Sequence, residues 1–559
     1  MNNNLINNIK CGFIRVLRCR VKLAWLFSLF LGVAHLAGKL FYNNLVQTDS
    51  VEFIPTAITF ILLWAMYYVL LKLLYCALDS ADLKAKRAQR FYSKFSEKPF
   101  LYSLITMLFF WLPHLLIKYP SGLCGDSAGQ IFQNFYSYSA HHPVLHTLFL
   151  GAFIKIGIAF GSANMGLFAS TTAQTLIQAF VFAYSVKVAV RKRAKDWAVW
   201  LMLAFFCLCP YVTGYVGECV KDILYVVFLY LFVVSITNWA REDEYWKSAE
   251  NIIVLLFASF GTTMFRNNGK FVVIPTLLIV GVIELVSQRK KHGNGLLIKL
   301  AVLLCCCALP IVATNCINSA VNAEKGKLAE ALSMPAQQTA RYLRDYPDEV
   351  TDAEREKIST VLNFDELPKV YNPRISDPTK GQFRPDTKLS DLYDYMDAWI
   401  SMFFKHPMCY VNATLEQNYY LFFPEYNNYT YYLGTEDCES YYELAKAYEV
   451  YIGTPEILER LMPYYSAMLD FLHTAPILSI INNMAVFDIV FVMLCAFFLS
   501  KKRYKELVIL LPSFLSIGIV ILAPCIKYHV RYAFPIIYTV PFIMSAYTMP
   551  SAKENDGLA

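Results

Sequence analysis

The residue best suited to catalysis in this chain is an aspartate in a polar loop. Asp126 is the only acidic residue between positions 119 and 142. A carboxylate with a pKa near ~4 is ionised at neutral pH and can accept the proton of an attacking hydroxyl group. The alternative is a structural role, in which Asp126 caps the helix that follows it. We expect Asp126 to be the catalytic base.

Several cations at the ends of apolar segments could bind a phosphate group. Lys221 begins one apolar run, Arg266 lies between two others, and Arg531 precedes the last one. A guanidinium group offers two parallel donors that fit phosphate oxygens, and an ammonium group offers a compact charge. Residues of this kind also serve as anchors at the membrane boundary. We predict a donor-phosphate site made by Lys221, Arg266, Arg531, His141 and His142.

A second set of polar residues falls on the same predicted side of the membrane. Ionisable groups at this depth are costly unless they are paired or functional. Amide and carboxylate groups could bond to the hydroxyl groups of an acceptor or position the phosphate. This acceptor and positioning set contains Gln130, Gln133, Glu218, Asp222, Asn267, Asn268, Gln337, Gln338 and Arg341.

The histidines raise the alternative of a metal site. His142 and His146 are one helical turn apart, so both could bind one ion with Asp126 as a third ligand. Zinc motifs normally have tighter spacing, and hydrogen bonding by the imidazole groups is the favoured interpretation. We therefore predict no resident metal and no certain cofactor, with a divalent cation as the alternative.

A scaffold of membrane-embedded helices must position these residues. The chain of 559 residues is 57% hydrophobic and only 17% charged, whereas a soluble domain is about 25% charged. Apolar runs of about 20 residues recur along the chain, and an α-helix needs that length to cross a bilayer. This composition excludes a disordered chain and argues against a purely cytosolic enzyme.

The apolar runs predict an all-α polytopic membrane protein with about twelve transmembrane helices. The expected spans are 23–42, 53–78, 99–118, 166–190, 197–216, 222–239, 250–266, 270–288, 295–315, 476–500, 506–525 and 532–549. A further run, 143–160, is expected to be an interfacial helix on the outer side. If this run crossed the membrane, the basic segment 191–195 would lie outside, against the bias of Lys and Arg towards the cytoplasm.

The charge bias sets the expected orientation in the plasma membrane. The predicted inner segments hold 25 Lys and Arg residues, whereas the short outer loops hold five. Both termini are therefore expected in the cytoplasm. The basic residues of the inner segments account for the net charge of +7. We therefore predict no nucleic-acid partner.

The runs also divide the chain into five parts. These are a two-helix N-terminal extension (1–98), a membrane module (99–315), a mostly helical extracytoplasmic insert (316–475), C-terminal spans (476–549) and a cytoplasmic tail (550–559). Within the insert, Ser333 followed by Pro335 predicts the start of a helix. Cys409 and Cys438 leave a disulfide open.

The order of the motifs resembles the C-type glycosyltransferase superfamily, polytopic enzymes that use lipid-phosphate-linked sugars. The resemblance rests on Gly125-Asp126-Ser127 in the first functional outer loop, the helix opened by His142-Pro143, and the pair Lys221-Asp222. Many C-type enzymes carry a second acid beside the first-loop aspartate. Here Ser127 stands at that position, which argues against a metal site with two acids.

The chain more closely resembles an uncharacterised bacterial family of polytopic membrane proteins, over roughly residues 99–545. The segments that carry this resemblance are 126–133, His141-His142-Pro143 with Thr147, Lys221-Asp222, 266–269, and 334–338 with Arg341. The two leading spans, 23–78, look like an addition.

These resemblances imply a membrane glycosyltransferase that moves a hexosyl or pentosyl group from a polyprenyl-phosphate donor, with inversion. The implied partners are the polyprenyl-phosphate sugar, a cell-envelope glycan or lipid acceptor on the outer face, and membrane lipids. The alternatives are a flippase or transporter of lipid-linked glycans, a polymerase or ligase of envelope polysaccharide, and a scaffold in an envelope-assembly complex.

Overall fold

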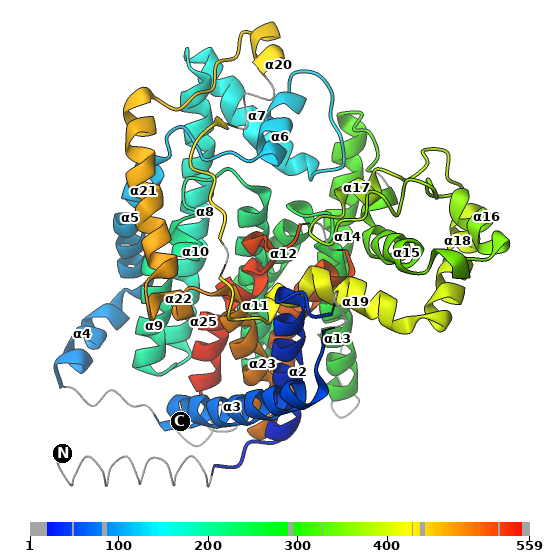
Figure 1. Cartoon of the computed structure of the whole chain (residues 1–559). Helices are drawn as coiled ribbons and strands as arrows, with labels where there is room; N and C mark the ends of the chain where they lie inside the picture. The colour runs from blue at the N-terminus through cyan, green and yellow to red at the C-terminus, as the bar shows by residue number, and fades with distance from the viewer. Residues whose placement is uncertain are drawn as a thin grey trace.

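All the regular secondary structure in the described part of the computed structural model is helical (Figure 1). The described residues are 19–46, 50–80, 86–288, 295–326, 328–427, 429–436, 442–523 and 526–550. In these ranges there is no β-strand, and four isolated bridges are the only strand-like pairs. The all-α prediction is confirmed. Cys438 and positions 551–559 of the predicted tail lie outside the described residues.

Seven helices of the described chain are long and apolar enough to cross a bilayer. They are α2 (Ala24–Tyr42), α3 (Phe53–Ser80), α5 (Pro99–Ile117), α8 (Ala163–Arg191), α11 (Lys221–Arg241), α13 (Lys270–Gln288) and α14 (Gly295–Ala320). Each coincides with one of the twelve expected spans. The chain therefore has the helices of a membrane-embedded protein. α14 continues to Ala320, five residues beyond the predicted end of its span.

Six shorter apolar helices occur in the described ranges. They are α7 (Val144–Ala159), α9 (Asp196–Leu208), α12 (Ala249–Met264), α23 (Met484–Ser500), α24 (Leu511–Leu522) and α25 (Phe534–Thr548). Five of them coincide with the remaining expected spans, and α7 coincides with the expected interfacial helix. Local sequence shortens some of them. In α23, the Asn483 side chain accepts a hydrogen bond from the Ala485 amide, 2.9 Å away, so the helix begins at Met484 rather than at 476.

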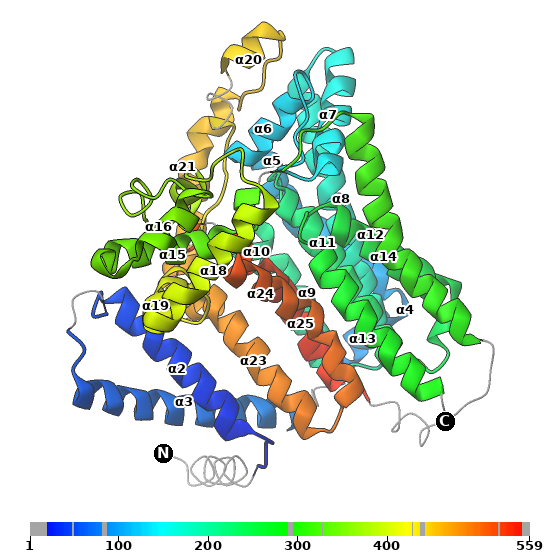
Figure 2. The same ribbon diagram turned by 90° about the vertical axis from the view of Figure 1, so that its right-hand side faces the viewer.

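Helix α11 forms the centre of the helix bundle, and every residue of its apolar window is buried. It packs against α8, α12 and α25, and Figure 2 shows α11, α12, α13 and α14 running side by side. Gly261 of α12 permits one of these contacts, because a Cβ there would lie 2.2 Å from the Phe228 ring. By contrast, only 17% of the apolar windows of α3 and α14 is buried, which leaves their apolar side chains for lipid.

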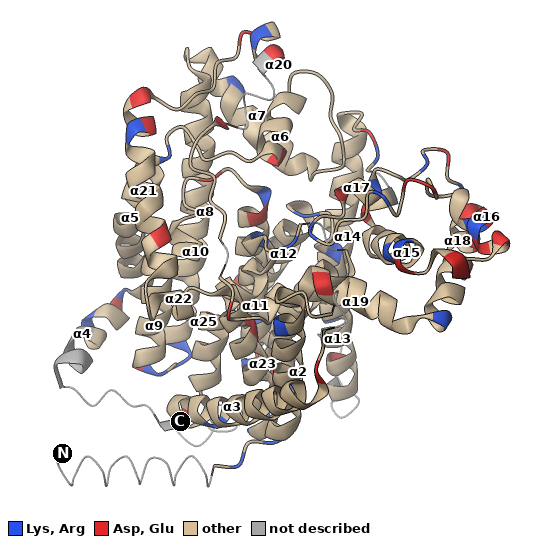
Figure 3. Ribbon diagram, in the orientation of Figure 1, with Lys and Arg blue, Asp and Glu red and all other residues tan. Residues whose placement is uncertain are grey.

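The insert forms a small helical unit beside the bundle. Its helices are α15 (Ser333–Asp345), α16 (Asp352–Ser359), α17 (Asp377–Lys380), α18 (Leu389–Lys405) and α19 (Pro407–Asn418). The predicted start at Ser333 is confirmed. The unit has its own apolar core, which includes Tyr342, Leu362, Tyr395 and Met402. Figure 3 shows charged residues concentrated around α16 and α18.

After α19 the chain returns along the bundle through residues 419–436, which we call the return segment. It begins with the 3₁₀ turn η4 (Tyr419–Leu421). The helices α20 (Tyr442–Ala447), α21 (Glu456–Thr474) and α22 (Leu478–Ile481) follow it, and α21 packs beside α5 (Figure 1).

The N-terminal hairpin of α2 and α3 is anchored to the return segment. The His35 imidazole bridges the Glu425 carboxylate (2.9 Å) and the Tyr67 hydroxyl (2.8 Å). Gly38 allows a close approach here, because a Cβ at that position would lie 2.7 Å from the Phe423 Cβ. The hairpin therefore packs on the insert as well as on the bundle.

Candidate functional site

Two loops that are far apart in sequence lie side by side and place Asp126 next to Lys221. The Gly122 amide bonds to the Gly217 carbonyl, and the Cys219 amide bonds to the Gly122 carbonyl, each at 2.9 Å. Gly217 has a φ of +81°, a conformation that suits glycine. Asp126 lies in the first turn of α6 (Gly125–Gln133), and Lys221 begins α11.

The Asp126 carboxylate is surrounded by positive and imidazole groups. Its Oδ2 lies 2.7 Å from the Lys221 Nζ and 3.4 Å from the Arg531 Nη1. The His142 Nδ1 is 3.1 Å from the same Lys221 Nζ, and the His142 Nε2 is 3.8 Å from the Asp126 Oδ1. The carboxylate therefore has three of the predicted phosphate ligands around it.

Asp222 extends this arrangement to a second arginine. Its Oδ1 lies 3.4 Å from the Arg266 Nη1, and its Oδ2 lies 3.7 Å from the Arg531 Nη1. The Arg266 guanidinium also stands 5.0 Å from the centre of the Tyr225 ring. The charged cluster, as we call it, has five members: Asp126, Lys221, Asp222, Arg266 and Arg531. Its two carboxylates and three cations carry a formal charge of +1.

The surroundings fix the charge states of the cluster. Burial raises the pKa of the Asp126 carboxyl, but Lys221, Arg531 and His142 together bring it well below its ordinary range. Burial lowers the pKa of the Arg531 guanidinium, yet Asp222 and other groups raise it well above its usual value. Burial, with Lys221 next, lowers the pKa of His142 to about 3. His142 is therefore neutral and acts through hydrogen bonds.

A tyrosine and a histidine that the sequence analysis left out of the site border the cluster. The Tyr432 hydroxyl lies 3.2 Å from the His529 Nε2, two residues before Arg531. Burial and Arg531 lower the pKa of His529 to about 3, so this imidazole is neutral as well. Tyr432 belongs to the return segment, and its pattern in the sequence is typical of an aromatic belt. The run of aromatic residues that contains it is also compatible with a platform for sugar rings, and this is the signal that could have indicated a site.

Glu218 does not join the charged cluster, and its carboxylate forms a separate buried ion pair. The Lys118 Nζ is 2.7 Å from the Glu218 Oε1, and neither side chain is exposed. The Tyr432 amide also bonds to Glu218 Oε1, at 3.1 Å. Next to this pair, a Cβ on Gly122 would overlap the Tyr432 carbonyl oxygen. The contacts indicate that Glu218 holds the return segment in place.

Two glutamines of the positioning set tie α6 to its neighbours. The Gln130 amide donates to the Thr147 hydroxyl, 3.0 Å away, and its Oε1 lies 3.1 Å from the His146 Nδ1. The Gln133 Oε1 accepts a hydrogen bond from the Ser139 amide at 3.1 Å. Both side chains therefore support the loop that carries Asp126 and His142.

The turn between α12 and α13 is joined to the same loop. The Asn267 amide donates to the carbonyls of Ala140 (3.0 Å) and His141 (3.1 Å). The backbone carbonyl of Asn268 accepts from Phe271, at 3.0 Å. His141 points away from the cluster towards Glu330, 4.0 Å from its carboxylate, and 45% of its side chain is exposed.

The three predicted residues of α15 lie in the core of the insert. Gln337 donates to the Asn372 carbonyl (3.0 Å), and Gln338 donates to the Thr414 hydroxyl (2.9 Å). Arg341 pairs with Glu416 at 2.6 Å. As far as the chain is described, these side chains make no contact with the charged cluster. They help to shape the insert, which adjoins the bundle where the Lys527 amide bonds to the Arg374 carbonyl (2.7 Å).

Among the residues that the structure describes, no group of three or more His, Cys, Asp and Glu side chains is arranged to hold a metal ion. The set considered from the sequence was His142, His146 and Asp126. The Lys221 ammonium lies between Asp126 and His142, and His146 turns to Gln130 instead. The positive charge at this position comes from the protein itself.

The fold and the site define an all-helical, membrane-embedded protein with a charged cluster at the ends of its helices. The chain belongs to a family of unknown function, DUF6020, whose model matches residues 134–557. The matched region includes four members of the cluster and begins eight residues after Asp126. Neither the curated proteins nor the solved structures give a match to the chain.

Proposed function

We propose that the protein is a membrane glycosyltransferase of the C-type, which transfers a sugar from a polyprenyl-phosphate donor to a cell-envelope acceptor. The observation that carries this proposal is the charged cluster. Three separate segments bring the Asp126 carboxylate within 2.7 Å of an ammonium group and 3.4 Å of a guanidinium group, and a fourth adds Arg266 through Asp222. A general base beside phosphate-binding cations is the minimum that transfer from a phosphate-linked sugar requires.

The charge of the cluster favours a donor with a single phosphate. A polyprenyl monophosphate sugar is a phosphodiester with one negative charge, which matches the formal +1 of the cluster. A pyrophosphate-linked donor, as a polymerase or ligase would use, brings a second charge that the cluster does not balance. After transfer the lipid product is a phosphate monoester, whose second ionisation has a pKa near ~6. The cations then stabilise the charge that develops on the leaving group.

The reaction proceeds as a single displacement with inversion. The acceptor hydroxyl attacks the anomeric carbon and gives its proton to an Asp126 carboxylate oxygen. The bond from the anomeric carbon to the phosphate oxygen breaks, and its electron pair stays on that oxygen. Lys221, Arg266 and Arg531 bind the phosphate before and after this step. Asp126 then releases its proton to water.

The pairing of Asp126 with Lys221 links base strength to donor binding. A carboxylate whose pKa is held far below its ordinary range is a weak base. A phosphate that competes for the Lys221 ammonium group weakens this pairing, and the basicity of Asp126 rises. The base therefore becomes effective when the donor is bound.

The proposal includes the membrane arrangement. Twelve spans, with α7 at the outer interface, place both termini in the cytoplasm and the insert and the charged cluster on the outer side. The five short apolar helices at the remaining expected positions support this count. The low burial of α14 supports a lateral path from the lipid to the site.

Purified protein in lipid nanodiscs, supplied with labelled polyprenyl monophosphate sugars and an envelope extract as acceptor, tests the function. A transferase releases polyprenyl phosphate and labels the extract, and Asp126→Asn slows both by about 10²- to 10⁴-fold. In proteoliposomes, movement of the intact lipid across the bilayer without release of phosphate would instead identify a flippase. Release only from pyrophosphate-linked donors would identify a polymerase or ligase.

A further inference from the structure

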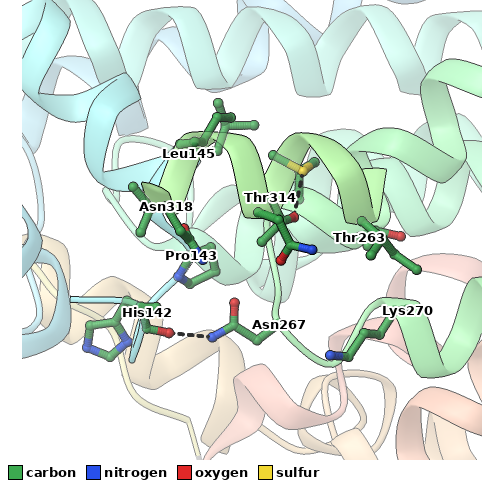
Figure 4. Close-up of a pocket in the computed structure, with 14 residues that line it drawn as sticks. His142, Pro143, Leu145, Thr263, Asn267, Lys270, Thr314 and Asn318 are labelled. Atoms are coloured by element: carbon green, nitrogen blue, oxygen red, sulfur yellow. Dashed lines mark hydrogen bonds between the residues drawn. The ribbon is translucent and has the colours of Figure 1, made fainter. Parts of the chain in front are cut away.

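A cavity of about 290 Å³ lies beside the charged cluster. Its walls are the start of α7, the turn between α12 and α13, and the last turns of α14, and Figure 4 shows these elements around it. Its polar lining residues are His142, Thr263, Asn267, Lys270, Thr314, Asn315 and Asn318. Of these, only His142 and Asn267 belong to the site predicted from the sequence.

The polar groups of this cavity are accessible to a ligand, because Lys270 and Asn315 are exposed and Asn318 is only partly buried. Within the described part of the chain, the side-chain amides of Asn315 and Asn318 and the Lys270 ammonium group form no hydrogen bond or ion pair. Figure 4 shows Lys270 extending towards Asn267. By contrast, the neighbouring Thr314 hydroxyl is used, since it donates to the Pro310 carbonyl at 2.8 Å. Amide and ammonium groups without partners suit a ligand with several hydroxyl groups.

The rest of the lining is apolar, and the space is small. Pro143, Leu145, Met264 and Ile311 form apolar parts of the wall. A sugar ring likewise has polar edges and apolar C–H faces. A volume of 290 Å³ corresponds to roughly ten water molecules at ~30 Å³ each. This space is comparable to one sugar ring.

His142 joins the cavity to the charged cluster. His142 is one of the lining residues, and its two ring nitrogens lie 3.1 Å from the Lys221 Nζ and 3.8 Å from the Asp126 Oδ1. His142 thus stands between the cavity and the Lys221 ammonium group, where a ring and its phosphate would meet. The anomeric carbon, which joins ring and phosphate, then lies beside His142 and near Asp126.

We propose that this cavity is the subsite for the sugar ring of the donor, with Asn315, Asn318 and Lys270 bonding to its hydroxyl groups. The proposal rests on the proposed function, because it assumes that the phosphate binds at the charged cluster. The cavity lies on α14, the weakly buried helix at the edge of the bundle (Figure 2), so the lipid tail can remain in the bilayer.

Binding of short donor analogues to the full chain in nanodiscs tests this subsite. The probes are the methyl ester of farnesyl phosphate, a singly charged phosphodiester without a sugar, and farnesyl phosphate linked to glucose, mannose, N-acetylglucosamine or arabinose. The wild type is expected to bind at least one linked form about tenfold or more tightly than the sugar-free form, a gain that two or three hydrogen bonds supply. Equal affinity for all five probes would overturn the proposal.

Variants locate the sugar contact. Asn318→Trp fills the cavity and is expected to remove the gain from the sugar, while the affinity for the sugar-free methyl ester stays unchanged. Cys316→Trp, on the exposed side of the same helix, is the matched control and keeps the gain. Asn315→Ala with Asn318→Ala removes the amides without added bulk and gives the same loss. A sugar gain that survives both Asn318 variants would contradict the subsite.

The two proposals fail in different ways. If the subsite is wrong, donor sugars are transferred normally by the Asn318 variants. If the function is wrong, the wild type binds a sugar-linked probe tightly but releases no polyprenyl phosphate.

Discussion

The Lys221 Nζ lies 2.7 Å from the Asp126 Oδ2, and this contact joins loops that are 95 residues apart in the chain. Ser127 and Cys219 reinforce the junction through a hydrogen bond from the Ser127 hydroxyl to the Cys219 carbonyl. The backbone segments that carry the acid and the cation are thus adjacent, and the Lys221 side chain completes the contact. In the proposed function, Asp126 as the base and Lys221 as a phosphate ligand therefore act as one unit.

Replacing the cations should weaken phosphate binding. We expect Lys221→Met and Arg531→Met each to reduce the affinity for farnesyl phosphate by about 10- to 100-fold, because a charge-assisted hydrogen bond contributes about 1.5–3 kcal/mol. Calorimetry on the protein in nanodiscs measures this effect. Lys155→Met, which removes an exposed lysine of α7 that is 5.9 Å from the Phe135 ring, is the control and should change nothing. Wild-type affinity in both cluster variants would contradict the phosphate site.

The pH profile should be flat on the acid side of neutrality. Asp126 is ionised there because its pKa lies well below the ordinary range, and His142 and His529 are neutral because the pKa of each is about 3. None of these groups changes charge between about pH 5 and 7, where a free histidine would titrate near ~6.5. We expect kcat/KM for donor cleavage to be constant over this range. A fall with a midpoint near ~6.5 would show that a histidine of the site must change its charge.

Much of this site could be predicted from the sequence because membrane helices fix the side on which their ends emerge. Arg266 and Arg531 were placed on one side with Asp126 by the bias of Lys and Arg in the other loops, and they meet through Asp222 and Asp126. The cluster itself, however, required three-dimensional packing. No pattern in the sequence shows which of several outer loops come into contact.

The Lys118–Glu218 pair illustrates what the sequence concealed. Lys118 ends an apolar run and is the last residue of the predicted span 99–118, a position that suits its long aliphatic stem. Its partner is 100 residues away, so no local spacing indicated the pair. Glu218 was instead assigned to the acceptor set because it stands three residues before Lys221. The contact between His529 and Tyr432 likewise has no local spacing in the sequence, because only the folded chain brings these residues together.

Removing Glu218 should affect stability. Glu218→Ala leaves the Lys118 ammonium group buried without its carboxylate, and loss of one partner of a buried pair costs about 3–5 kcal/mol. It also removes the acceptor for the Tyr432 amide, so the return segment should loosen. We expect a lower midpoint of thermal unfolding in detergent.

Glu456→Ala provides the comparison for this experiment. Its pair with Arg460 is exposed, with 77% of each side chain accessible, and exposed pairs contribute little. Equal midpoints for Glu218→Ala and Glu456→Ala would contradict the anchoring role of Glu218.

The most direct test of the account is the rate of sugar transfer by Asp126→Asn. This variant keeps the shape of the side chain and removes the base, and general base catalysis contributes about 10²- to 10⁴-fold. We predict a loss of that size in the initial rate of polyprenyl phosphate release, at equal protein abundance and with farnesyl phosphate still bound. Asp352→Asn, at the first residue of α16 in the insert, should retain the full rate. An Asp126→Asn protein that transfers sugar at the wild-type rate would contradict the assignment of this cluster as the catalytic site.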